Sequence, residues 1–302
     1  MNSNCAQELQ RLKDIWLDYK RSQNLSPRSI EAYDKRVSWF IKYMDGFNLQ
    51  SAEDIKPAHI VVYMQYLREL GWSSESVFDY CKDVRIWWRW LHKMELVNHD
   101  IMRKVELPKR VEVAKTALND EQLHKLLDAC DGKDWLSRRD RAIIATLVDT
   151  GLRASEFLTM TVADGKNGRF IVTGKGARQR MVVLSRDAQL EIIRYLKSLP
   201  FPLDDGDKLW QGTKGPLTLY GLYQVVRAVG ERAGVEVTPH ALRRTCATSM
   251  LRAGASLEVV RVTLGHSGYS ILQKYIRLSE EDIAEQHERY SPLQRLRRKR
   301  RR

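Results

Sequence analysis

A break in the apolar pattern between Leu107 and Thr116 divides the chain into two parts of different character. The segment contains a proline and charges of both signs, and it carries no helical stripe. Apolar residues before it recur at helical spacing, whereas the part after it also contains short strand-like runs. A chain of 302 residues is long enough for two such domains. We therefore predict a mainly α fold with a small β component: a helical domain at 1–107, a linker at 108–117, a mixed α/β domain at 118–290 and a basic, disordered tail at 291–302.

The first part is expected to form a compact domain of four helices. Apolar residues recur at helical spacing from Leu9 to Tyr19 and from Ile30 to Ile41. Ser26 followed by Pro27 is typical of a helix start, because serine can cap and proline suits the first helical position. The third and fourth helices are predicted over 57–70 and 74–94.

The fourth of these helices combines tryptophans with basic residues. Such a helix can lie in a DNA groove, or its tryptophans can be core residues with the basic side chains on a solvated face. We favour the core for Trp87, Trp88 and Trp90. Some of the basic residues are predicted to contact DNA, and the candidates are Arg85, Arg89 and Lys93.

The second part is expected to combine helices with one β-hairpin. Runs at 169–173 and 180–184 predict two strands, and Gly174-Lys175-Gly176-Ala177 between them is typical of a hairpin. Helices are predicted over 120–130, 137–150, 186–198, 218–233, 239–253, 256–264, 270–277 and 280–290.

Composition argues against several classes of protein. No apolar run approaches the ~20 residues that span a bilayer, and the polar N-terminal residues are unlike a signal peptide. The four cysteines are scattered without a Cys-x-x-Cys pair, which argues against a zinc ribbon and a disulfide framework. We accordingly predict a protein of the reducing cytoplasm, nucleoid-associated if bacterial or archaeal, with no membrane partner.

Known cofactor motifs are also missing from the sequence. Gly174-Lys175 lacks the glycine spacing, the following Ser or Thr and the flanking helix of a phosphate-binding P-loop. No His-Glu-x-x-His motif is present, and no carboxylate cluster resembles a two-metal nuclease. The sequence therefore predicts no nucleotide, no metal and no other cofactor.

The net charge of +13 favours a polyanionic partner, with nucleic acid first. The last twelve residues carry seven basic and no acidic side chains, so the tail supplies over half of this excess. The remaining part of the chain is only mildly basic. Net charge is thus weak support for DNA binding, and the tail is expected to add salt-sensitive contacts to phosphate.

The segment from Thr238 to Arg243 predicts an anion site. Thr238 and Pro239 are typical of a helix start, which places His240 in the first turn and Arg243 on the same face. The free N–H groups and the helix dipole favour an anion at this end. An imidazole and a guanidinium there suit one phosphate, although a plain surface pair is the alternative for this segment alone.

Three further segments favour the phosphate site. Gly151-Leu152-Arg153-Ala154-Ser155-Glu156 places Arg153 at a turn, with Glu156 near enough to orient it. Leu264-Gly265-His266-Ser267 presents a second histidine at a helix end, and Tyr275 follows nine residues after His266.

In order and spacing these segments resemble the tyrosine recombinase (phage integrase) family of site-specific DNA recombinases. Residues 151–156 are similar to its first arginine box, 240–248 to its second, and 264–275 to its end. The hairpin around Lys175 is similar to the lysine-bearing hairpin of the family. The resemblance covers about 118–290, and the helical first domain is similar in size and place to the family's core-binding domain.

Two departures from the family pattern are visible. Arg244 stands where many relatives carry histidine, and Gly268-Tyr269-Ser270-Ile271-Leu272 replaces a common Ser-x-x-Thr-Thr. The second departure adds Tyr269 as a rival nucleophile. Arg244, together with Arg178 beside the hairpin turn, is a further candidate for DNA contact.

The resemblance implies cleavage of a phosphodiester without metal. Arg153 and Arg243 would hold the non-bridging oxygens by bidentate hydrogen bonds, and Glu156 would orient a cationic partner. Tyr275 would attack, and because a phenol titrates near ~10 it needs help, for which His240 is the candidate base. The remaining roles are Lys175 as general acid for the leaving 5′ oxygen and His266 as hydrogen-bond donor to the phosphate.

The resemblance further implies a covalent 3′-phosphotyrosyl intermediate and a homotetramer that exchanges strands between two double-stranded DNA sites through a Holliday junction. This chemistry would serve integration or excision of a mobile element, or resolution of DNA. Because the chain starts almost directly on its first helix, we expect the simple two-domain type without an arm-binding domain. A type IB topoisomerase and an inactive DNA-binding relative are the alternatives, and the last helix can dock in cis or in trans.

Overall fold

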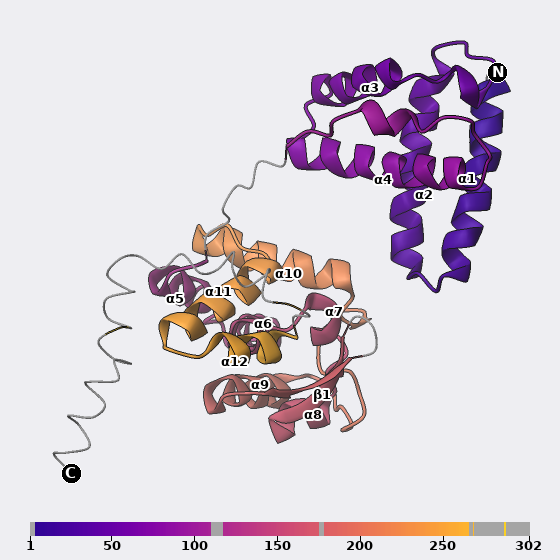
Figure 1. Cartoon of the computed structure of the whole chain (residues 1–302). Coiled ribbons are helices and arrows are strands. Elements are labelled where there is room, and N and C mark those ends of the chain that lie inside the picture. The colour runs from indigo at the N-terminus through magenta and orange to yellow at the C-terminus, as the bar shows by residue number, and fades with distance from the viewer. Residues whose placement is uncertain (1–3, 110–116, 175–177, 266–267, 269–286, 288–302) are drawn as a thin grey trace, which may run out of the picture. The chain divides into compact units, whose positions relative to one another are not determined.

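The computed structural model describes the chain apart from residues 1–3, 110–116, 175–177, 266–267, 269–286 and 288–302 (Figure 1). It divides into two compact units, Met1–Val113 and Ala114–Arg302. The division lies within residues 108–117. Each unit has its own hydrophobic core.

The described residues of the first unit form a bundle of four α-helices in which α1 and α2 lie side by side (Figure 1). The Ser26 hydroxyl accepts a hydrogen bond from the Ser29 amide and Pro27 opens the helix, so the predicted start of α2 is confirmed. The predicted third and fourth helices are also confirmed, each ending one residue early. The helices are α1 (Asn4–Ser22), α2 (Pro27–Asp45), α3 (Pro57–Glu69) and α4 (Ser74–Lys93), with short 3-10 turns at Ala52–Asp54 and Ile101–Lys104.

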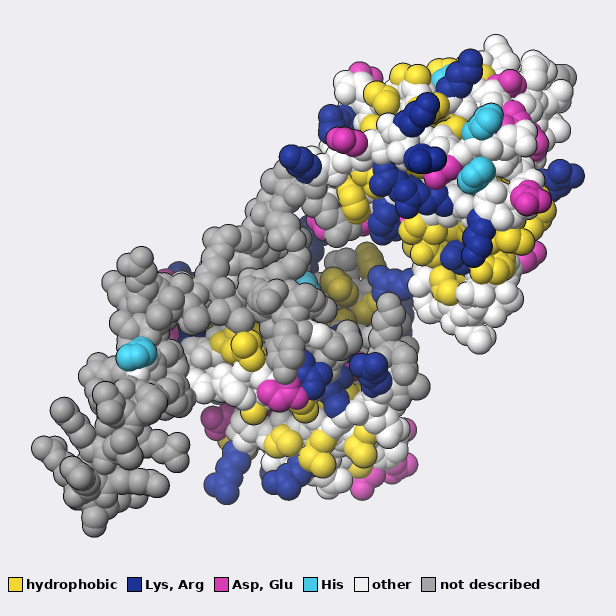
Figure 2. All heavy atoms as spheres, in the orientation of Figure 1, with side chains coloured by type: hydrophobic (Ala, Val, Ile, Leu, Met, Phe, Trp, Pro, Cys, Tyr) yellow, Lys and Arg dark blue, Asp and Glu magenta, His cyan; other side chains and the backbone are white. Residues whose placement is uncertain are grey.

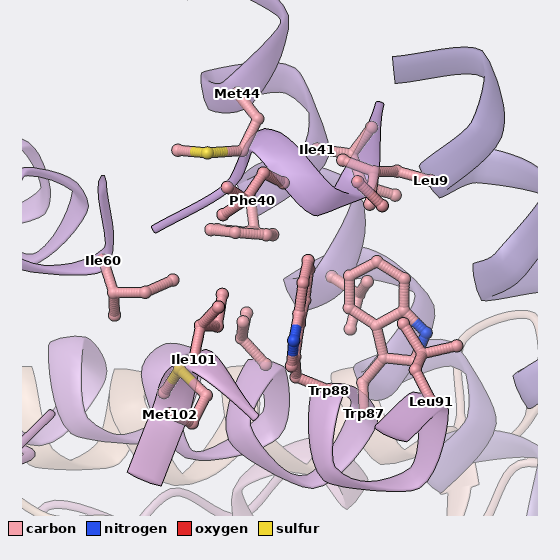
Figure 3. Close-up of a cluster of buried hydrophobic side chains, with 14 of the residues drawn as sticks. Leu9, Phe40, Ile41, Met44, Ile60, Trp87, Trp88, Leu91, Ile101 and Met102 are labelled. Atoms are coloured by element: carbon pink, nitrogen blue, oxygen red, sulfur yellow. The ribbon is translucent and has the colours of Figure 1, made fainter. Parts of the chain in front are cut away.

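Tryptophans of α4 form the centre of this core. The rings of Trp87 and Trp88 are almost fully buried and pack edge-on against Phe40 of α2, with ring centroids 6.4 Å apart in both pairs (Figure 3). The indole of Trp88 donates to the carbonyl of His99. Trp90 is half-buried and packs on Tyr19. The core interpretation is therefore confirmed for Trp87 and Trp88, and truncating either to alanine costs roughly 3–5 kcal/mol.

The second unit packs helices around α6, which contacts both α9 and α11. Its helices are α5 (Asp120–Asp128), α6 (Trp135–Thr150), α7 (Ala154–Phe157), α8 (Val162–Asn167), α9 (Arg186–Ser198), α10 (Leu219–Ala233), α11 (Pro239–Arg252) and α12 (Leu257–Leu264). Its strands are β1 (Arg169–Thr173), β2 (Gln179–Val183), β3 (Gln211–Gly212) and β4 (Gly215–Pro216).

Strands β1 and β2 form the predicted antiparallel hairpin, with Ile171 opposite Met181. Alternation places Phe170 and Val172 in the core and leaves Ile171 exposed, as expected for a sheet that packs on one face. The mainly α fold with a small β component is confirmed. The predicted helices at 270–277 and 280–290 lie outside the described residues, except for His287.

The elements α8, β3 and β4 were not predicted from the sequence, because each is too short to show a hydrophobic period. Helix α7 is equally short, but the sequence indicates its start directly after Gly151. Its first turn is fixed by the Glu156 carboxylate, which accepts a hydrogen bond from the Arg153 amide. Across the described ranges, we find no helix with the length and apolarity needed to cross a membrane.

Candidate active site

A sharp turn between α6 and α7 positions Arg153. Helix α6 ends at Gly151, which has a left-handed backbone (φ 58°), and α7 begins directly after Arg153. A β-carbon on Gly151 would lie 2.4 Å from Cδ2 of Leu264, so the turn packs against the end of α12. Glycine is needed here for both reasons, and the result is an arginine at the start of a helix facing another helix end.

The start of α11 positions His240 and Arg243. The Thr238 hydroxyl accepts from the Ala241 amide, and Pro239 takes the first helical position. His240 lies exposed in the first turn, whereas Arg243 is only 4% exposed. The Arg243 guanidinium donates to the carbonyl of Gly151 at 2.6 Å and to that of Leu264 at 2.7 Å. These bonds tie α11 to the turn that carries Arg153.

The carboxyl end of α12 is the meeting point of three arginines. Three consecutive carbonyls each accept from a different guanidinium. Thr263 accepts from Nε of Arg180 at 3.0 Å, Leu264 from Nη2 of Arg243 at 2.7 Å, and Gly265 from Nη2 of Arg153 at 2.9 Å. The partial negative charge at a helix C-terminus favours cations there. The end of α12 thus brings Arg153 and Arg243 together.

Glu156 is the buried anion of this cluster and is 4% exposed. It accepts from the Arg153 amide at 3.0 Å and from Nη1 of Arg153 at 2.8 Å. Arg180 donates to both of its oxygens, at 3.0 and 2.7 Å. Burial alone would raise the pKa of Glu156, but the hydrogen bonds from Arg180 and Arg153 outweigh it and lower that pKa to about 2. The carboxylate is therefore ionised throughout the physiological range.

Arg180 was missed by the sequence analysis. It shares the inward face of β2 with Val182, two residues on, and its side chain is 8% exposed. An arginine at an inward strand position is rarely buried without an anionic partner, so the alternation in β2 held the signal.

Lys175, His266, Tyr269 and Tyr275 lie outside the described residues. Residues directly before two of them are anchored in the cluster. Gly174 lies so close to Glu156 that a β-carbon would sit 3.3 Å from Oε1, and the Gly265 carbonyl binds Arg153. Gly174 and Gly265, the residues that precede Lys175 and His266, therefore lie at the cluster.

The candidate DNA contacts lie in both units. In the first unit, Arg85 and Arg89 line a cavity of about 570 Å³ together with Lys82, and Figure 2 shows Lys and Arg side chains gathered on this unit. Arg85 donates to the Val105 carbonyl, and Arg89 lies 3.6 Å from the Asp100 carboxylate.

The other three candidates differ in exposure. Lys93 is exposed at the end of α4, and Arg178 is exposed just before β2. Arg244, which follows Arg243 on α11, is half-buried. DNA contact by these residues stays a prediction. Among the described side chains, no group of three or more His, Cys, Asp or Glu could hold a metal ion.

The family of this protein follows from its similarity to known proteins. The family model described as the phage integrase family matches residues 116–282, more than half of the chain. The chain belongs to the phage integrase family. It is thus a site-specific tyrosine recombinase, an enzyme that breaks and rejoins DNA strands.

Relatives of this recombinase match over nearly its whole length. Tyrosine recombinase XerD of Listeria monocytogenes is 30% identical over 280 residues, which cover 89% of this chain and 94% of XerD. The XerH site-specific recombinase bound to its difH substrate has a TM-score of 0.70 at 21% identity, over 89% of this chain and 82% of that one. The lambda integrase tetramer bound to a Holliday junction has a TM-score of 0.72 at 16% identity, over 88% and 76%. The two structures show the shared fold, and the relatives favour a recombinase over a topoisomerase or an inactive DNA-binding protein.

Proposed function

We propose that this recombinase cleaves DNA through a covalent 3′-phosphotyrosine on Tyr275 and releases a 5′-hydroxyl. The observation that carries this proposal is the convergence of Arg153 and Arg243 on adjacent carbonyls at the end of α12. Two guanidiniums fixed within one turn of each other suit the two non-bridging oxygens of a single phosphate.

The arginines supply electrostatic stabilisation that exists before the substrate binds. As Tyr275 attacks, negative charge grows on the non-bridging oxygens of the phosphorane, and fixed donors stabilise that charge without reorganising. The ionised Glu156 holds the Arg153 backbone and guanidinium in place by 3.0 and 2.8 Å bonds. Arg153 and Arg243 therefore bind phosphate, and Glu156 orients Arg153.

Proton transfer completes the reaction. His240 is exposed in the first turn of α11, one helical turn before Arg243, where it can take the phenolic proton as general base. Lys175 protonates the leaving 5′ oxygen, and His266 donates a hydrogen bond to the phosphate. Each step exchanges one phosphodiester for another, so bond energy is retained and no nucleotide is consumed.

The substrates are double-stranded recombination sites, and the active assembly is a homotetramer on two such sites. The lambda integrase structure, a tetramer on a Holliday junction, shares this fold and supports this assembly. Arg85, Arg89, Lys93, Arg178 and Arg244 add contacts to DNA. Integration, excision and resolution all use this chemistry, and the enzyme acts on DNA in the cytoplasm.

A nicked suicide substrate tests the proposal. Duplexes that bind the protein are selected from a randomised pool and nicked near the cleavage position, so that a short strand leaves and religation fails. We expect an SDS-resistant protein–DNA adduct with the wild type and with the control variants Tyr269→Phe and Tyr290→Phe, and none with Tyr275→Phe. An adduct that persists in Tyr275→Phe would overturn the assignment of the nucleophile.

A further inference from the structure

All three nitrogens of the Arg180 guanidinium donate hydrogen bonds within the protein. Nη1 and Nη2 donate to the two oxygens of Glu156 at 3.0 and 2.7 Å, and Nε donates to the Thr263 carbonyl at 3.0 Å. The side chain is 8% exposed. The recombination chemistry gives Arg180 no contact with DNA and no proton to transfer, so these bonds must serve another purpose.

The Glu156 carboxylate is the point where Arg180 meets Arg153. An ionised carboxylate has about four lone-pair sites, and here four donors use them. Two come from Arg180, and two come from the amide and Nη1 of Arg153. The fork of Arg180 fixes the plane of the carboxylate, and the carboxylate in turn fixes the Arg153 guanidinium. Without Arg180 the carboxylate keeps one partner and can rotate.

The backbone encloses Arg180 on its other side. Gly265 has a left-handed backbone (φ 65°), and a β-carbon there would lie 2.8 Å from Nη1 and 3.0 Å from Cδ of Arg180. Its carbonyl binds Nη2 of Arg153. Arg180 therefore contacts both groups that hold the Arg153 guanidinium, namely the Glu156 carboxylate and the carboxyl end of α12.

We propose that Arg180 is a positioning residue that holds Arg153 in the orientation required for phosphate binding, through Glu156 and the carboxyl end of α12. This inference rests on the proposed role of Arg153. If Arg180 and Glu156 formed a purely structural ion pair, replacing Arg180 would change the stability of the protein and leave the cleavage rate of the folded enzyme unchanged.

Arg139 provides a matched control in the same unit. Its side chain is also 8% exposed, its Nε and Nη2 donate to one oxygen of Asp140, and its Nη1 donates to the Gln211 carbonyl. It thus makes the same kinds of bond, with a carboxylate and a backbone carbonyl. Within the described part of the chain, its guanidinium makes no hydrogen bond to Arg153, Glu156 or α12.

The test is a double-mutant cycle on adduct formation in a single turnover, with protein saturating over the suicide substrate. Arg180→Met, Arg139→Met and Arg153→Ala are made singly, and each methionine change is combined with Arg153→Ala. We expect Arg180→Met to slow cleavage by roughly 10–100-fold in the wild-type background and by less than about threefold when Arg153 is absent. Arg139→Met changes the rate by less than about threefold in both backgrounds.

Arg180→Lys is a second variant for the same test, to be used if Arg180→Met does not fold. It keeps a cation beside Glu156 but lacks the planar fork, so it is expected to slow cleavage less, and again only when Arg153 is present. Equal losses in both backgrounds, or an Arg139→Met loss as large as that of Arg180→Met, would overturn the inference. Absence of any adduct with the wild type would instead contradict the proposed function.

Discussion

Two buried carboxylates of the second unit, Glu156 and Asp140, are each shared by two arginines but connect different parts of the chain. Glu156 binds Arg153 and Arg180, and Asp140 binds Arg139 and Arg232. The arginines of Glu156 reach carbonyls at the end of α12, where Arg243 also binds.

The arginines of Asp140 reach other places. Arg139 donates to the Gln211 carbonyl in β3, and Arg232 donates to the Ala129 carbonyl beside α5. These bonds join α6 to β3 and α10 to the end of α5, and among the described residues they involve none of the candidate catalytic residues. The bonding of a buried arginine–carboxylate cluster therefore does not reveal its role, whereas the backbone segments that it joins do.

The largest expected difference between the clusters follows from removing one arginine of each. Arg153→Ala should lower the single-turnover cleavage rate by roughly 10²–10³-fold, because a fixed donor to the developing charge is lost. Arg232→Ala should leave that rate within about twofold of wild type. Adduct formation on the suicide substrate measures both, and similar rates for the two variants would remove the functional distinction between the clusters.

Acid titration tests how much the charge of Glu156 stabilises the folded protein. The pKa of Glu156 lies at about 2 in the folded protein, below its ordinary value of 4.5. The ionised carboxylate therefore stabilises the folded state above about pH 4.5, and this contribution is lost as the pH falls towards 2. The shift corresponds to about 3 kcal/mol at neutral pH.

Urea unfolding between pH 7 and pH 3 tests this contribution by comparing wild type with Glu156→Gln. The variant should be less stable at pH 7, and the gap between the two curves should narrow as the pH falls. A gap that stays constant over this range would show that the charge of Glu156 does not stabilise the fold.

The next largest expected effect follows from removing the negative charge of each carboxylate. Glu156→Gln keeps the shape of the side chain but weakens its hydrogen bonds to Arg153, so the cleavage rate should fall about tenfold. Asp140→Asn should lower the thermal midpoint without changing the rate of the folded enzyme. Circular dichroism melts and adduct formation at a temperature where both variants are folded separate the two quantities. A tenfold rate loss in Asp140→Asn would contradict the comparison.

Sequence reasoning succeeded where the information is local. Ser26-Pro27 and Thr238-Pro239 mark helix starts, and the left-handed Gly151 marks a helix end, through bonds made within a few residues. The structure has these helix boundaries at all three places. The pair Arg153–Glu156 is likewise three residues apart. The strand bounds of the hairpin were right to within one residue.

The missed features depend on distant parts of the chain. Arg180 meets Glu156 across 24 positions and Thr263 across 83, which no local pattern reveals. The bond from the Arg85 guanidinium to the Val105 carbonyl, 20 positions away, was likewise not predicted, and DNA contact by Arg85 stays a prediction. Elements such as α8 are too short to show the hydrophobic period from which a helix is predicted.

The smallest expected effect concerns the stability contribution of Arg232. Its side chain is 47% exposed and its Nη2 lies 3.2 Å from Asp140, so solvent screens the pair. Arg232→Ala should lower the free energy of unfolding by less than about 1 kcal/mol, measured by urea denaturation. Arg139→Met should cost more, because it leaves the buried Asp140 with the exposed partner alone. If the two variants were equally destabilised, the exposed Arg232 would stabilise Asp140 as well as the buried Arg139 does, and burial would not explain a difference between the two arginines.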